Sequence, residues 1–158
     1  MSTENAFGPA ELVVKLRTIA AGPASADRLT AVASFVQGTD ARFSTCMIWK
    51  RSTEGLSLVA DVGEHHEECP LPAGGGISQL AVGTNQSVLV GNNKAADRTI
   101  ECYLFAGAEL AIPIPAPDGQ TWGAIHLQSE QIEAFTSSDR TLLTAVAAII
   151  GEWLQSGD

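Results

Sequence analysis

Three cysteines in this 158-residue chain could take part in thiol chemistry. Cys69 and Cys102 lie in irregular stretches, where a thiol reacts if its pKa is lowered and solvent can reach it. The alternative is that a free cysteine packs as a small apolar side chain. That second reading is expected for Cys46, which lies in an apolar strand. Cys69 adjoins Pro70 in a polar loop and is expected to be more exposed.

Polar residues also interrupt the apolar strands near the end of the chain. Glu109 begins such a strand, where a charge is costly unless it meets solvent, a partner or a ligand. The sequence leaves ligand contact and a solvent-facing strand end open. His126 and Gln128 are predicted to share one strand face with Trp122 and Ala124. That face either lines a cavity or faces solvent from an edge strand.

Two further patterns do not predict the sites they suggest at first sight. The run from His65 to Cys69 contains several metal-ligand types, but consecutive loop residues rarely reach one ion and no zinc spacing is present. Gly74 to Gly76 lacks the Lys and Ser/Thr of a phosphate-binding loop. We therefore expect no metal, no cofactor and no nucleotide hydrolysis. The backbone amides after these glycines could still meet a carboxylate where a short helix starts.

Hydrophobic periodicity predicts the elements that would position these residues. The pattern predicts helices at 11–21 and 25–38, a hairpin of strands at 43–50 and 56–62, a short helix at 77–82, a strand at 87–90, an irregular stretch at 91–107, a hairpin at 110–114 and 122–127, and a last helix that starts at 136–139. This order predicts an α+β fold, with terminal helices on one face of an antiparallel sheet and crossover loops on the other. Such loops are expected to cover a cavity over the sheet.

Composition restricts the class of protein. A length of 158 residues with 45% hydrophobic and 17% charged residues predicts a single folded domain across 1–158. Eighteen acidic residues against nine basic ones give a net charge of −9, which argues against nucleic acid or anionic membranes as partners. No export signal and no apolar run of membrane-spanning length is recognisable. We expect a cytoplasmic protein with reduced thiols.

Several segments together resemble the GAF domain. The stretch from Leu71 to Ser78, continued through Glu109 to Ile114, looks like the middle of that domain. Its ending is similar too, with 123–129 as the final strand, 134–139 before the last helix and a pair of leucines at 142–143. The likeness implies a GAF-like fold with a core of about 25–155.

Within that family the chain is most similar to the free methionine-R-sulfoxide reductases. The resemblance implies a nucleophile at Cys102 and a resolving thiol at Cys69. It also places a pocket carboxylate at Glu109, but His126 and Gln128 stand where those enzymes carry two more acids.

Two other positions of the reductase pattern have counterparts here. Ser78 replaces a further cysteine, and Trp49 is the clear counterpart of the aromatic residues on the first strand.

Two functions follow as hypotheses. The first is a non-catalytic sensor for a small polar organic ligand, signalling to a protein partner. In it, polar contacts would come from Glu109, His126, Gln128 and Ser78, apolar walls from Trp49 and Tyr103, and a lid from the Cys102 loop. The alternative is a thiol reductase that uses Cys102 and Cys69. A third reading, a dimerisation module with a collapsed cavity, also stays open. Apolar faces on the first and last helices predict a homodimer.

Overall fold

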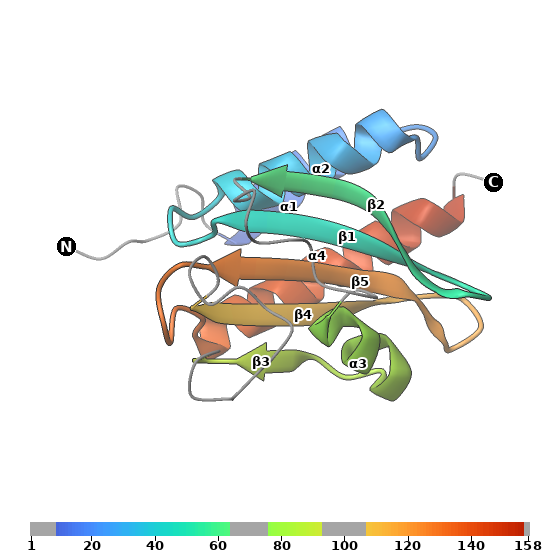
Figure 1. Cartoon of the computed structure of the whole chain (residues 1–158). Helices are drawn as coiled ribbons and strands as arrows, with labels where there is room; N and C mark the ends of the chain where they lie inside the picture. Colours follow the sequence, from blue (N-terminus) through green and yellow to red (C-terminus); the bar gives the residue numbers. More distant parts are fainter. Residues whose placement is uncertain (1–8, 64–75, 93–106, 157–158) are drawn as a thin grey trace.

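The computed structural model describes residues 9–63, 76–92 and 107–156, which form four helices and five strands (Figure 1). In chain order these are α1 (Pro9–Ile19), α2 (Ala26–Gly38), β1 (Thr45–Ser52), β2 (Gly55–Gly63), α3 (Ile77–Thr84), β3 (Val88–Val90), β4 (Ala108–Pro115), β5 (Thr121–Ser129) and α4 (Ser137–Ser156). Each predicted element in these ranges is present, with boundaries that differ by a few residues.

The strands form one antiparallel sheet in the order β2-β1-β5-β4-β3. The final hairpin of β4 and β5 therefore inserts between β1 and β3, and β5 lies in the middle. A strand with a neighbour on each side exposes no edge to solvent. The expectation that the second strand of this hairpin could be an edge strand is wrong.

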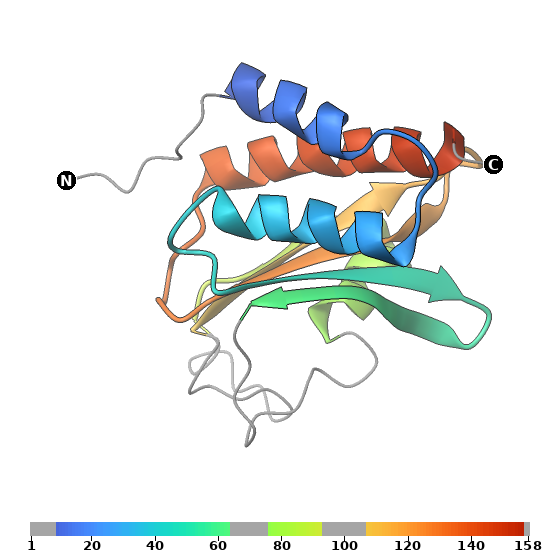
Figure 2. The same cartoon turned by 90° about the horizontal axis from the view of Figure 1, so that it is seen from above.

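Helices α2 and α4 cover one face of the sheet, α1 packs on the outside of these two helices, and α3 lies on the opposite face (Figure 2). Alternation along the strands explains how the sheet packs against the terminal helices, since every second side chain points toward them. Cys46 and Ile48 of β1 and Ile125 and Leu127 of β5 all belong to this core. The predicted α+β architecture is confirmed.

Cys46 is fully buried in this core, as predicted. Burial raises the pKa of its thiol far above the usual range, and the nearby charge of Asp61 adds to the effect. A protonated, inaccessible thiol is a poor nucleophile. Cys46 is therefore a packing residue.

Capping residues mark where two of the helices begin. The hydroxyl oxygen of Ser25 accepts a hydrogen bond from the Arg28 amide at 3.2 Å, so Ser25 is the N-cap of α2. At α4, the Asp139 amide donates to the Thr136 hydroxyl at 3.1 Å, and the Thr136 amide donates back to the Asp139 carboxylate at 2.8 Å. These two bonds form a reciprocal cap at the start of α4, which was predicted to lie at 136–139.

Trp122 does not share a face with His126. Ile114 pairs with Gly123 while Pro115 pairs with Thr121, so one extra residue of β5 breaks the alternation at Trp122. The Trp122 side chain packs against the core under the helices, and Thr121 points toward α3 instead, where its hydroxyl donates to the Val82 carbonyl at 3.4 Å. The predicted position of Trp122 is wrong.

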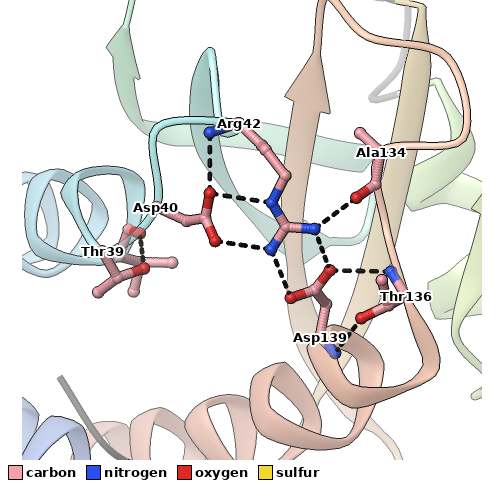
Figure 3. Close-up of polar contacts among 7 residues, drawn as sticks. Thr39, Asp40, Arg42, Ala134, Thr136 and Asp139 are labelled. Carbon is pink, nitrogen blue, oxygen red and sulfur yellow. Dashed lines mark hydrogen bonds and ion pairs between the residues drawn. The ribbon is translucent and has the colours of Figure 1, made fainter. Parts of the chain in front are cut away.

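An ion cluster fixes the loop that leads into β1 (Figure 3). The guanidinium of Arg42 lies between the carboxylates of Asp40 and Asp139, at 2.6 Å and 2.9 Å, and also donates to the Ala134 carbonyl at 2.6 Å. All its N–H groups thereby have acceptors. These contacts join the α2–β1 loop to the start of α4.

Within the described residues, no helix has the length and apolar character needed to cross a membrane.

Candidate functional site

The sheet face that carries α3 also carries a row of polar side chains. Thr45, Met47 and Trp49 of β1 alternate with the core residues Cys46 and Ile48, so they point away from the terminal helices. The register places Thr45 opposite Gln128, Met47 opposite His126 and Trp49 opposite Ala124. On the other side of β5, Glu109 lies opposite Gln128 and Ala111 opposite His126.

Register therefore brings the polar residues of three strands together. Oε1 of Glu109 lies 2.8 Å from Nε2 of His126, and the same oxygen accepts from Nε2 of Gln128 at 2.9 Å. The hydroxyl of Thr45 donates to Oε1 of Gln128 at 2.9 Å. This bond fixes the orientation of the Gln128 amide, because the amide oxygen accepts a hydrogen bond from Thr45 and the amide nitrogen donates one to Glu109.

Both members of the Glu109–His126 pair are fully shielded from solvent, each with 0% exposure. The tautomer of the His126 ring decides which of the two groups donates in this contact. Buried polar groups are tolerated when hydrogen bonds compensate the loss of water. The pair is therefore a compact acid–base unit in the middle of the sheet.

Three other buried polar atoms on or beside this face have no hydrogen-bond partner among the described residues. They are Nε1 of Trp49, Oγ of Ser78 and Nδ1 of His126. Trp49 is 5% exposed and Ser78 is 0% exposed. Buried polar groups are nearly always satisfied in native proteins, so unsatisfied ones require an explanation such as a ligand or an ordered water.

Helix α3 brings Ser78 to this part of the sheet. Ile77 and Ala81 pack on Ala111, the residue directly opposite His126. Ser78 follows Ile77 in the first turn of the helix, which begins after Gly76 at a φ of 55°. A positive φ favours glycine, which explains the residue at this tight entry to the helix.

The match to known families decides the classification of this fold. Residues 26–155 match the family model of the GAF domain. The chain belongs to the GAF domain family. A search of curated proteins finds no relative of this GAF domain.

Solved structures with the same fold include both enzymes and sensor domains. One is fRMsr of Staphylococcus aureus in its reduced form, with a TM-score of 0.80 at 19% identity over 98% of this chain and 99% of that one. Another is free methionine-R-sulfoxide reductase from Neisseria meningitidis in complex with its substrate, with a TM-score of 0.78 at 20% identity over 98% and 95%. A putative GAF sensor protein from Burkholderia vietnamiensis has a TM-score of 0.78 at 19% identity over 96% and 98%.

The structure brings together the polar residues that the sequence singled out in this GAF domain. Glu109, His126 and Gln128 are in contact, and Trp49 and Ser78 are buried on or beside the same face. A solvent-facing strand end for Glu109 is excluded by its burial.

Cys69, Cys102 and Tyr103 lie outside the described residues. Over the part of the GAF domain that is described, no group of three or more His, Cys, Asp or Glu side chains could hold a metal ion.

Sequence reasoning missed Thr45, which orients Gln128. Its signal was available in the alternation of β1, because Thr45 has the same parity as Trp49 and lies on the same face. What the pattern lacked was the register, which alone puts Thr45 opposite Gln128. The Arg42 cluster was missed for the same reason, since Arg42 and Asp139 are distant in the chain.

Proposed function

We propose that this GAF domain is a sensor that binds a small polar organic molecule on the sheet face of Glu109, His126 and Gln128. The observation that carries the proposal is the set of buried, unpartnered polar atoms on Trp49, Ser78 and His126 among the described residues. Leaving such a group unsatisfied costs about 1–3 kcal/mol. A ligand that supplies the missing partners recovers that free energy on binding.

The contrast with the Arg42 cluster supports a binding role for this face. Around Arg42 every guanidinium donor has an acceptor, as expected of a group that stabilises the fold. On or beside the sheet face of His126 the polar atoms are also buried, yet three lack partners among the described residues. Polar groups arranged in this way suit recognition of a guest molecule.

A thermal-shift screen against a panel of polar metabolites tests this proposal. A compound at one hundred times its dissociation constant is expected to stabilise the protein by about 2.7 kcal/mol, because it binds the folded chain alone. The stabilisation should fall in Trp49→Phe, which loses the indole N–H and keeps an aromatic ring. It should persist in Trp122→Phe, on the opposite face.

Failure of every compound to raise the melting temperature of wild type would contradict a sensor role. Equal loss of stabilisation in the Trp49 and Trp122 variants would place the binding site elsewhere.

The second candidate function is reduction of a methionine sulfoxide by the thiols of Cys69 and Cys102. Its support is the fold shared over nearly the whole length with free methionine-R-sulfoxide reductases, one of them in complex with its substrate. Cys46 is inert, so two of the three cysteines are left for the chemistry. The thiols would form one disulfide, and the sulfoxide oxygen would leave as water with the two thiol hydrogens.

Thiol counting tests this candidate. Reduced protein is incubated with free methionine-R-sulfoxide, quenched in acid, unfolded and titrated. The expected result is a fall from three thiols to one, with one methionine released per chain. Cys102→Ser should abolish the release, and Cys46→Ala should leave it unchanged. Three remaining thiols and no methionine in wild type would exclude the reductase.

A further inference from the structure

A cavity of about 520 Å³ lies between the sheet and the helices α2 and α4. Its walls come from the start of α2, from β1, β2 and β5, and from Leu154 near the end of α4. The volume falls within the range of about 300–1,000 Å³ that is usual for small-molecule sites. Glu109, His126 and Gln128 do not line this cavity, so it is separate from the proposed sensor site.

Two β-bulges turn side chains toward this cavity. The register of β1 and β2 shifts after Ile48, which leaves Val59 with no residue opposite it. Trp122 is the corresponding extra residue of β5. Val59 and Trp122 both pack on the helix side of the sheet, and both line the cavity. Bulges of this kind re-aim side chains and are over-represented beside functional sites.

Lys50 is the one charged side chain among the described residues that line the cavity. Its ammonium lies 5.9 Å from the centroid of the Trp122 ring, close enough for a cation–π contact. The Lys50 side chain forms no ion pair with the described residues. The contact with the ring therefore holds the ammonium beside the cavity and leaves its N–H donors for a guest.

Other charges near the cavity do not cancel that of Lys50. Ala26, in the first turn of α2, lines the cavity, and the partial charge at the start of a helix is also positive. Asp27 is the acidic residue of the same turn, and it does not line the cavity. A negatively charged guest is therefore favoured over a positively charged one.

Most of the remaining wall is apolar. Leu29 of α2, Val59, Trp122 and Leu154 supply aliphatic and aromatic surface. Val59, Trp122 and Leu154 are half-buried, so part of this surface is open to a guest. Covering exposed apolar surface is favourable, because it removes that surface from water. The walls therefore suit a guest with an apolar body.

We propose that this cavity is a second ligand site, which binds a small organic anion with an aromatic body. The aromatic ring packs against Trp122 and Val59, and the anionic group meets the ammonium of Lys50. A cationic guest would bring like charges together, and an anion without a ring would leave the apolar walls uncovered. This inference does not depend on the proposed sensor function, which uses the opposite face of the sheet.

Probes that differ in charge or in size test this assignment. Naphthoate, naphthamide and naphthamidinium share one ring system and are anionic, neutral and cationic, whereas acetate is an anion without the ring. Each is titrated into isotope-labelled full-length protein at constant ionic strength, and the indole N–H signals of the three tryptophans are followed by NMR. Trp122→Phe assigns the relevant signal. We expect naphthoate to shift it with an affinity about three- to tenfold above that of naphthamide, and naphthamidinium and acetate to leave it unchanged.

Two neighbouring cations of β1 give a first matched pair of variants. Lys50→Met removes the charge beside the cavity and keeps an apolar stem, so it should weaken naphthoate binding about three- to tenfold. Arg51→Met removes the same charge one residue further along, outside the cavity, and should have no such effect. This pair separates a local contact from the overall charge of the protein.

Two exposed alanines of α2 give a second matched pair. Ala26→Leu should fill part of the cavity and weaken naphthoate and naphthamide alike. Ala31→Leu, which lies outside the cavity on the same helix, should leave both affinities unchanged. The melting temperatures of the four variants show whether they fold.

Several results would overturn the second site. Naphthamide as tight as naphthoate, equal weakening by Lys50→Met and Arg51→Met, or no effect of Ala26→Leu would each do so. A shift of the Trp49 signal without that of Trp122 would also overturn it, because the anion would then bind on the opposite face. None of these results decides whether the polar face of Trp49 binds a ligand, which the thermal-shift screen tests by itself.

Discussion

Replacement of Arg42 by methionine is expected to lower the free energy of unfolding by about 3–5 kcal/mol. The side chains of Asp40 and Asp139 are 1% and 7% exposed, so both carboxylates would be left buried without their shared cation. Methionine keeps an apolar stem of similar length, which isolates the effect of the charge. Urea unfolding monitored by circular dichroism measures the change.

A surface ion pair is the matched control. Arg17 lies 3.6 Å from Glu152, with side chains that are 57% and 69% exposed. Such pairs contribute little because water screens them, so Arg17→Met should change stability by less than about 1 kcal/mol. Equal effects of the two substitutions would show that the Arg42 cluster is not what holds the start of α4 to the α2–β1 loop.

The pH dependence of the Arg42 effect has a defined sign. Burial raises the pKa of Asp40, but the hydrogen bonds and charge of Arg42 outweigh it and the net pKa lies below the usual value. A group with a lowered folded-state pKa stabilises the fold above its unfolded pKa, and this contribution is lost as pH falls through the folded value. The difference between wild type and Arg42→Met should therefore narrow below about pH 4.

The fold was predictable because it depends on local patterns. Hydrophobic periodicity identified the helices and strands, and the structure shows local caps at Ser25 and Thr136 where two of the helices begin. Each of these signals is contained within a few residues. The antiparallel architecture then follows from short connections within the hairpins and from helices with one buried stripe.

The contacts within the site were less predictable, because they depend on register between distant segments. Glu109, His126 and Gln128 stood out as polar residues in apolar strands, but their mutual bonds require the β4–β5 pairing. One extra residue in β5 reversed the face of Trp122. The alternation of side chains along one strand cannot reveal such a bulge, because a bulge is defined by the pairing of two strands.

The Glu109–His126 pair provides the second large effect. His126→Leu is expected to lower the free energy of unfolding by about 3–5 kcal/mol, because it removes a hydrogen-bond partner of the fully buried Glu109 side chain. Glu109→Met should cost less, about 1–3 kcal/mol, because the imidazole left behind loses one hydrogen bond. Both values are measured by urea unfolding.

The double variant Glu109→Met/His126→Leu distinguishes a binding role from a structural one. Two apolar side chains of similar volume need no partner, so the double variant should recover most of the stability lost by His126→Leu. It should also lose the ligand-induced thermal shift. If the stability lost by the double variant instead equals the sum of the losses of the two single variants, the pair contributes to fold stability. If stability returns and binding does not, the buried polar pair serves recognition, since the core of β4 and β5 folds as well without it.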